Sequence, residues 1–457
     1  MPTTAEPSGQ RSARSRMVRG LGLPVLVAVP ALALRISGAA VTPVLAAALF
    51  AAAVVAAAFL LTWGTELAEL DLGEGLALAL LALIAVLPEY AVDVVFAWKA
   101  GQDPSTWAPL ALANVTGANR LLIGVGWSVM TLFAIRAARR AGYPGPDVRK
   151  PDAARGRFGR GAAAVVLHRV QVVELAFLAV ASVYGLTLAL RRSLTILDTV
   201  LLVLIFLAYL WRVRHADRPA TDAAASDDDD EASELFGPAQ AVAALPARQR
   251  RWVTATMLLA AAGIIIAVAE PFADNLVSTG RQLHVNDFLL VQWVAPLASE
   301  TPEFIAVLLL AYRLNASAGL GALISSKINQ WTILVGVLPV VFAASAGGWH
   351  GLPLDTVQRE ELLLTAAQSM FAVALVITGR LTATGAWSLL GLFTAQFVLA
   401  WTLPVEMRGS ERLLLAGVYL LLALGLLIAR RRAVRDVLSA GLAGRSEDET
   451  PRCRPDR

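Results

Sequence analysis

The chain has 457 residues, of which 57% are hydrophobic and only 16% are charged. Ordinary globular domains contain roughly a quarter charged residues, so the composition excludes a disordered chain and argues against a soluble domain. The apolar stretches are continuous rather than alternating, which also disfavours a transmembrane barrel. An all-α integral membrane protein is the class that remains.

The charged and metal-ligating residues exclude several further classes of protein. The net charge of +4 is too small an excess to indicate a nucleic-acid partner. The single cysteine, Cys453, lies in a polar tail and rules out an internal disulfide or a thiolate cluster. The four histidines form no HxxxH pattern. We therefore expect a lipid bilayer as the partner, small inorganic cations as ligands and no bound cofactor. The oligomeric state stays open.

Apolar segments long enough to cross a membrane follow one another along the chain, since about 20 residues span the hydrocarbon core. The predicted spans are 20–38, 42–63, 74–98, 107–135, 165–189, 193–213, 252–276, 286–312, 318–346, 359–379, 383–403 and 411–429. The first contains Pro24 and Pro30 and follows a basic cluster. It is either a retained span or a signal peptide cleaved near Ser37.

The distribution of basic residues predicts the orientation. The loop 136–163, both ends of the segment 212–251 and the C-terminal residues 430–435 are rich in arginine and fall on one side of the predicted spans. Positive residues favour the cytoplasmic side. We therefore predict a multi-pass protein of the plasma (inner) membrane with its central loop and C-terminus in the cytoplasm.

The central loop contains an acidic run at 227–231. Such runs are usually solvated linkers, and this one lacks the spaced ligands and turn glycine of an EF-hand, so a regulatory cation sensor is the weaker alternative. The expected organisation has two halves with additions at both ends. Its parts are a basic tail with an extra span or signal (1–41), a first half (42–213), an acidic linker (214–251), a second half (252–403), and an extra span with a basic tail (404–457).

Two segments of the chain repeat one another. Residues 87–98 and 301–312 share Pro, Glu, an aromatic residue, Ala and a second aromatic residue at identical offsets. In the next span of each half, 116–126 aligns without gaps to 326–336. Glu89 and Glu303 lie in the third and eighth predicted spans, so the copies cross the membrane in opposite directions. Inverted repeats of this kind are typical of secondary transporters, with the site at mid-membrane.

The repeated Pro-Glu pairs point to cation binding. An ionised group at the bilayer centre costs a few kcal/mol, and proline leaves a helix carbonyl without its donor. Carboxylate and carbonyl oxygens are hard ligands that suit Na⁺ or Ca²⁺, so Glu89 and Glu303 are the predicted metal ligands. Further oxygen and amide ligands are expected from Thr116, Asn119, Ser326, Asn329 and Gln330.

Each of these residues also has a structural interpretation. A Pro-Glu pair can be a helix kink with a glutamate that snorkels. Asn119 and Asn329 can form interhelical hydrogen bonds. The hydroxyls of Thr116 and Ser326 can bond their own helix.

These motifs resemble the alpha repeats of the cation/calcium antiporter superfamily, which includes the sodium/calcium exchangers. That family's repeats carry Gly-Thr-Ser-Leu-Pro-Glu followed by a Gly-Ser-Asn-rich motif. Residues 87–89 and 301–303 match the Pro-Glu core, and 115–126 and 325–336 occupy the place of the second motif. The resemblance covers about 42–403. It implies a 5+5 inverted-repeat helical core with extra terminal helices, and alternating access as two bundles slide past the other helices.

The sequence departs from the family pattern at the expected ligand positions. The family's Thr-Ser pair is Ala85-Val86 in the first repeat and Ser299-Glu300 in the second, and Asp93 adds an acid one helical turn from Glu89. Ser299, Glu300 and Asp93 therefore join the candidate cation-binding residues.

Two basic residues, Arg120 and Lys327, stand where the family has small or polar residues. We expect them to compensate charge. Either one of them acts as a tethered cation in a family sodium site, or neighbouring carboxylates that resist joint ionisation carry protons.

These observations favour a secondary cation antiporter that moves Na⁺, Ca²⁺ or H⁺ by alternating access, rather than an enzyme. An intramembrane hydrolase is disfavoured because Asp93 has no matching aspartate in the second repeat. The alternative is a non-transporting membrane sensor or scaffold with the exchanger fold and an eroded cation site.

Overall fold

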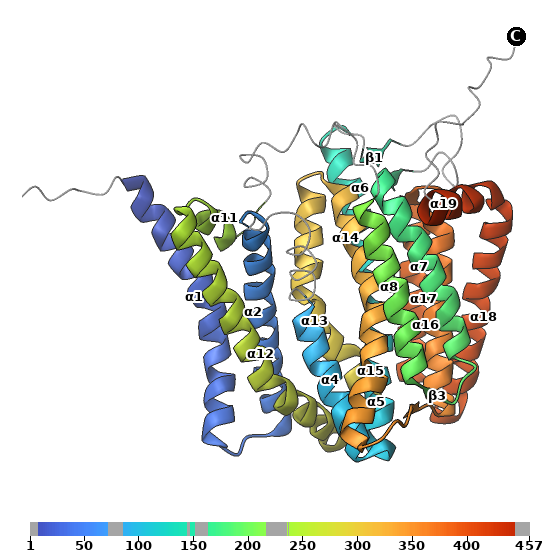
Figure 1. The fold of residues 1–457 in the computed structure, drawn as a ribbon, viewed down its shortest axis with the longest axis horizontal. Coiled ribbons are helices and arrows are strands. Elements are labelled where there is room, and N and C mark those ends of the chain that lie inside the picture. The colour runs from blue at the N-terminus through green and yellow to red at the C-terminus, as the bar shows by residue number, and fades with distance from the viewer. Residues whose placement is uncertain are drawn as a thin grey trace, which may run out of the picture. The chain divides into compact units, whose positions relative to one another are not determined.

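The computed structural model describes residues 8–71, 86–143, 147–150, 163–215, 235 and 237–443. These residues are almost entirely helical and belong to two compact units (Figure 1). Unit 1 comprises 1–118, 218–304 and 344–346, and unit 2 comprises 119–217, 305–343 and 347–457. Each unit therefore combines segments from both predicted halves of the chain.

Unit 1 is built around the pairing of two long helices. Its helices are α1 (Ser8–Ser37), α2 (Pro43–Glu69), α4 (Leu87–Gln102), most of α5 (Pro104–Leu121), α11 (Pro238–Ala243), α12 (Ala247–Leu283) and the first two thirds of α13 (Asp287–Tyr312). The helices α1, α2 and α12 lie side by side (Figure 1). α2 begins at Pro43, where the Oγ1 of Thr42 accepts a hydrogen bond from the Leu45 amide.

Small side chains let α2 and α12 approach closely. Ala53 and Ala57 of α2 and Ala261 of α12 are fully buried in one core with Phe272. A Cβ added at Gly64 of α2 would lie only 2.7 Å from Leu258 of α12. Close backbone approach through Gly and Ala is the usual way in which helices associate in membranes.

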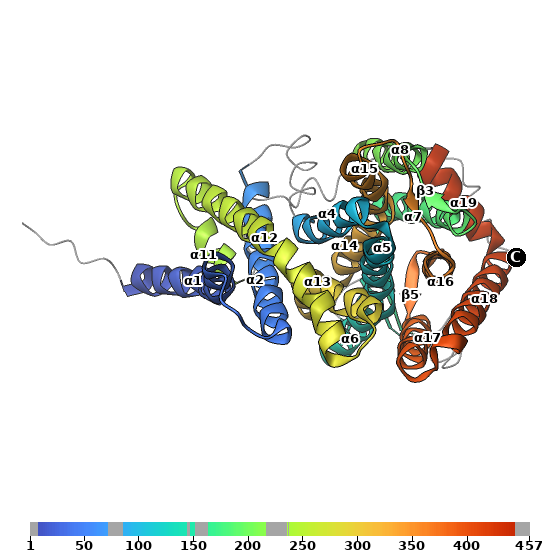
Figure 2. The same ribbon diagram turned by 90° about the horizontal axis from the view of Figure 1, so that it is seen from below.

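Unit 2 surrounds one central helix. It contains the end of α5, η1 (Leu122–Trp127), α6 (Ser128–Arg140), α7 (Arg169–Leu188), α8 (Ile196–Arg214), the end of α13, α14 (Ala316–Asn329), η3 (Gln330–Leu334), most of α15 (Val335–Ala346), α16 (Thr356–Val376), α17 (Ala383–Thr402), α18 (Val405–Ala429) and α19 (Arg431–Ala443). α16 packs between α7 and α18 (Figure 2). Ala366, Ala367 and Ala374 of α16 are fully buried.

Short antiparallel strands tie the helix connections of unit 2 together. β1 (Val148–Arg149), β2 (Ala164–Val166) and β5 (Arg380–Thr382) form one sheet in that order, and β3 (Ser193–Leu194) pairs with β4 (Leu352–Pro353). These strands cannot be predicted from the sequence, because two or three residues give no alternating pattern.

Ten helices in the described part of the chain are long and apolar enough to cross a membrane. Two predicted spans are not among them. For 359–379 the helix is present as α16, but Arg359, Glu360 and Glu361 make its start polar. For 74–98 only α4 is described, and residues 72–85 lie outside the described part.

The end of the predicted linker 214–251 is helical. α11 and the first turn of α12 fall within it, because Ala239 and Val242 of α11 bury against Leu67 and Met257. The acidic run at 227–231 lies outside the described residues.

An ion-pair cluster joins the end of α2 to the start of α12. Asp71 accepts hydrogen bonds from Arg250 at 2.7 and 2.8 Å and from Arg251 at 3.1 Å. The Asp71 side chain is only 7% exposed. The hydrogen bonds from Arg250, and then those from Arg251, lower the pKa of the Asp71 carboxyl below its ordinary value, against the opposing effect of burial.

We expect Asp71→Asn to destabilise the folded protein by about 2 kcal/mol at neutral pH, since it removes charge-assisted hydrogen bonds. A carboxyl whose pKa is lower in the folded state stabilises above its unfolded pKa, and this stabilisation is lost as the pH falls through the folded pKa. Thermal melts of the two proteins in detergent should therefore differ at neutral pH and converge in acid. A constant difference in melting temperature across that range would contradict the assignment.

Candidate cation site

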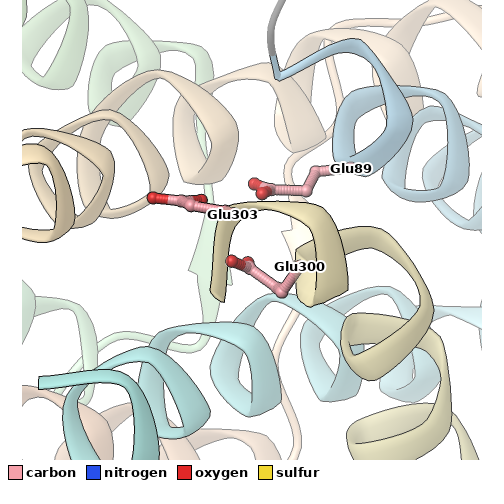
Figure 3. Close-up of side chains that lie close together, drawn as sticks. All are labelled: Glu89, Glu300 and Glu303. Atoms are coloured by element: carbon pink, nitrogen blue, oxygen red, sulfur yellow. The ribbon is translucent and has the colours of Figure 1, made fainter. Parts of the chain in front are cut away.

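Three glutamates gather in unit 1. One carboxylate oxygen from each of Glu89, Glu300 and Glu303 lies within 4.8 Å of the other two. Figure 3 shows Glu300 and Glu303 on successive turns of α13 and Glu89 on α4. Glu300 is fully buried and Glu89 is 5% exposed. Both repeated Pro-Glu motifs therefore contribute to one cluster, together with the glutamate that replaces the family's hydroxyl residue.

The two prolines of the motifs act differently in the two helices. Pro88 lies in the first turn of α4, where a missing N–H is tolerated, and Glu89 follows it in that turn. Pro302 lies inside the continuous helix α13, as does Pro296. The break in the helix that the sequence predicts beside each glutamate is therefore the start of α4 in the first repeat. In the second repeat it is a proline within the continuous helix α13.

The chemistry of the cluster follows from its charge. Three carboxylates at this separation repel one another when all are ionised, and burial strengthens the repulsion. A bound cation or bound protons relieve it. The oxygens are hard donors of the type that Ca²⁺ prefers. The cluster is thus suited to hold either a cation or protons.

Asp93 lies outside this cluster of three carboxylates. It is 1% exposed, and its Oδ1 accepts a 2.7 Å hydrogen bond from the Nδ2 of Asn114 on α5. Its Oδ2 finds no hydrogen-bond partner among the described residues. Helical spacing alone predicts that Asp93 lies beside Glu89, and it gives no indication of Asn114. No motif marked Asn114 as its partner.

The motif hydroxyls in unit 1 bond their own helices. The Oγ1 of Thr116 donates to the Leu112 carbonyl at 2.7 Å, and the Oγ of Ser299 donates to the Pro296 carbonyl at 3.2 Å. Both side chains are buried. For Thr116 this is the structural alternative that the sequence left open.

In unit 2, Lys327 binds Asn119. The Nζ of Lys327 donates to both the side-chain and the main-chain oxygen of Asn119, the latter at 3.3 Å. It also lies 4.8 Å from the centre of the Trp331 ring, in a cation–π arrangement. Lys327 and Asn119 are both fully buried. These two motif residues, one from each repeat, thus meet directly.

Arg120 forms a buried ion pair in unit 2. Its Nη2 lies 2.6 Å from Oε2 of Glu361 on α16. The two side chains are 1% and 5% exposed. The motif position of Arg120 predicts a charge-compensating role but does not indicate Glu361 as its partner. The two adjacent glutamates at 360–361, at the start of the predicted span 359–379, are the feature of the sequence that could have indicated this partner.

The remaining motif residues flank Lys327 in α14 and η3. Gln330 is fully buried, whereas Ser326 and Asn329 are half-buried. In each repeat a π-helix overlaps the second half of this motif, as η1 at Leu122–Trp127 and η3 at Gln330–Leu334. π-Helical turns are rare and often occur at functional sites. Their recurrence supports the alignment of the two repeats.

Gly117 allows α5 to approach α13. A Cβ at this position would lie 1.8 Å from the backbone oxygen of Gln292 on α13. No side chain fits that space without moving a helix. Gly117 follows Thr116 in the first repeat, and α13 also carries Glu300 and Glu303.

Comparison with known proteins identifies the family of the chain. The sequence model of the family described as sodium/calcium exchanger protein matches residues 41–213 and 253–402, which is more than half of the chain. No curated protein gives a significant match.

Two solved structures extend the comparison. The crystal structure of the H⁺/Ca²⁺ exchanger CAX is similar with a TM-score of 0.80 and 33% sequence identity, over 94% of this chain and 99% of that one. The structure of native YfkE has a TM-score of 0.51 at 13% identity, over 86% of this chain and 99% of that one, and shows the fold alone. These matches confirm the predicted family and the predicted exchanger-like helical fold with extra terminal helices.

We expect Gly117→Ala to prevent folding or to destabilise the protein by more than about 3 kcal/mol, the upper end of ordinary overpacking. Gly263→Ala on α12 is the matched control, since a Cβ there meets nothing within 4 Å. Replacing a helical glycine by alanine without a clash is neutral to stabilising. Size-exclusion profiles and melting temperatures in detergent test the pair. Equal stability of both variants would contradict the close α5–α13 contact.

Proposed function

Because this chain belongs to the sodium/calcium exchanger family and is therefore a multi-pass membrane antiporter of cations, we propose that it exchanges Ca²⁺ for protons at the Glu89–Glu300–Glu303 cluster. The observation that carries the proposal is the gathering of three carboxylates within 4.8 Å in unit 1. Both repeats contribute to this cluster, as expected for a transporter built from inverted repeats.

The charge of the cluster favours this pair of ions. Three carboxylates bring a charge of −3 when ionised, which a divalent cation offsets better than a single Na⁺ does. Without the cation, closely spaced buried carboxylates favour proton uptake. Binding of Ca²⁺ and binding of protons then exclude one another, which is the condition for exchange. The 33% identity with the H⁺/Ca²⁺ exchanger CAX supports the same ion pair.

The transport cycle in this proposal uses a site at the middle of the membrane and alternating access. Glu303 lies within α13, a helix of 26 residues that is long enough to cross the membrane. The arginine-rich segments on one side of the predicted spans support a cytoplasmic central loop and C-terminus in the plasma membrane. Of the other candidate ligands, Asp93, Ser299 and Thr116 share unit 1 with the cluster, whereas Asn119, Ser326, Asn329 and Gln330 lie in unit 2.

A non-transporting sensor with the same fold is the second candidate. It is favoured by the two basic residues in the second motifs, because Arg120 pairs with Glu361 and Lys327 binds Asn119. Buried side chains with a permanent positive charge at the motif positions are the change we expect in a site that no longer binds ions. The carboxylate cluster in unit 1 argues for transport.

Flux in proteoliposomes separates the candidates. We expect ⁴⁵Ca²⁺ uptake driven by a pH gradient, and its loss to below about a hundredth in Glu89→Gln and Glu303→Gln, because each removes a charged ligand worth several kcal/mol. Glu300→Gln should act in the same direction. Glu406→Gln, at an exposed position of α18, should retain full uptake.

Each outcome of the flux measurement has a distinct meaning. Uptake driven by Na⁺ but not by a pH gradient would replace H⁺ by Na⁺ as the coupling ion. Absence of flux under either gradient, in wild-type protein with a normal melting curve, would contradict transport and favour the sensor.

A further inference from the structure

The last described helix, α19, lies across the ends of its neighbours in unit 2 (Figure 1). α18 ends at Ala429 and is long and apolar enough to cross a membrane. α19 begins two residues later, at Arg431. The start of α19 therefore lies at a boundary of the membrane, where the hydrocarbon core gives way to the headgroups.

One face of α19 packs against the protein. A Cβ added at Gly441 would lie 2.4 Å from the Cβ of Ala176 on α7, and Val437 is buried. The Nη2 of Arg212 on α8 donates a 2.9 Å hydrogen bond to the Ala440 carbonyl. These contacts fix which side of α19 is turned away from the other helices of unit 2.

The opposite face of α19 carries arginine and leucine in one stripe. Arg431, Arg435, Leu438 and Leu442 follow one another at spacings of four, three and four residues, which places them on one side of a helix. All four are exposed, and so is Arg432 beside them. Leu438 and Leu442 are 37% and 45% exposed. The stripe is thus basic at the start of the helix and apolar toward its end.

The composition of this face suits a phospholipid. Arg431, Arg432 and Arg435 form no ion pair within the described residues, and Asp436 is the one acidic residue of α19. Guanidinium groups bind phosphate oxygens through paired hydrogen bonds. Exposed apolar side chains of a helix at the membrane boundary are buried among acyl chains. The face therefore offers both kinds of contact that one phospholipid molecule can use.

We propose that this face of α19 is a docking site for anionic phospholipids. Arg431, Arg432 and Arg435 hold the headgroups, and the acyl chains cover Leu438 and Leu442. Charge complementarity selects anionic over zwitterionic lipids, because a basic segment beside a membrane is attracted to net negative charge.

The acidic run at 227–231 of the same chain carries the same sign of charge as these lipids. All five of its side chains are carboxylates, so the run itself offers no apolar surface to the two exposed leucines. The combination of arginine and leucine in one stripe therefore favours lipid as the occupant.

Fluorescence quenching by brominated lipids tests the site without a transport assay. Cys453→Ser removes the single cysteine, and Ser439→Cys, half-buried on α19, carries a bimane label. The full-length protein is reconstituted in phosphatidylcholine vesicles that contain an equal fraction of brominated phosphatidylglycerol or brominated phosphatidylcholine. We expect phosphatidylglycerol to quench the label at least about twofold more strongly, since each arginine near the surface adds to the attraction. This excess should shrink at high salt.

A pair of triple variants tests the role of the arginines. Replacing the three arginines of α19 together by glutamine should remove the excess quenching by phosphatidylglycerol. The matched control combines Arg136→Gln, Arg139→Gln and Arg140→Gln, which removes the same charge from exposed positions of α6 and should retain the excess. Equal quenching by the two lipids without these replacements, or an excess that survives in the α19 variant, would overturn the proposal.

Two further variants test the apolar contact and the identity of the occupant. Leu438→Ser combined with Leu442→Ser should lower quenching by both brominated lipids, and unchanged quenching would overturn the contact with acyl chains. If an excess of quenching by phosphatidylglycerol emerges only after the acidic run at 227–231 is neutralised, that run covers the face and the proposal is overturned. These readouts involve no ion flux, so their failure leaves the proposed exchange of Ca²⁺ for protons to its own test.

Discussion

The rest of the structure depends on one constraint, which is that charged side chains buried between the helices must be compensated. A charge in a low-dielectric interior costs several kcal/mol unless another group compensates it. Asp93 has Asn114, Arg120 has Glu361, and Lys327 has Asn119 and the Trp331 ring. The Glu89–Glu300–Glu303 cluster differs from all of these, because it brings like charges together. A bound cation or bound protons would relieve the repulsion between these carboxylates, and the proposed exchange rests on this property of the cluster.

Much of the fold follows from the sequence, and for simple reasons. Long apolar segments predict helices, and the repeated Pro-Glu motifs predicted that Glu89 and Glu303 share one site. Glu300 was identified because it departs from the family's hydroxyl residue. The predicted role of Asp93 in that cluster relied on spacing along α4 alone. Spacing cannot show that Asn114, 21 residues away, takes up one of the Asp93 oxygens.

Contacts between distant segments were beyond prediction from one sequence. Glu361 pairs with Arg120 from a helix that is far away in the chain, and no local pattern links the two residues. The short strands around Val165 and Leu381 are likewise pairings of residues without a strand pattern of their own. The two bases in the second motifs were recognised as departures, but their partners emerged only from the fold. The chain thus combines an acidic cluster in unit 1 with compensated bases in unit 2.

The central claim, that a cation and protons compete for the three carboxylates, is tested most directly by counting the protons released when Ca²⁺ binds. Isothermal titration of purified protein in buffers of different ionisation enthalpy gives this number. The account predicts release of at least about one proton per Ca²⁺ near neutral pH, since closely spaced buried carboxylates retain protons. It also predicts that the release disappears together with Ca²⁺ binding in Glu303→Gln. Binding of Ca²⁺ without proton release, or binding that survives in Glu303→Gln, would contradict it.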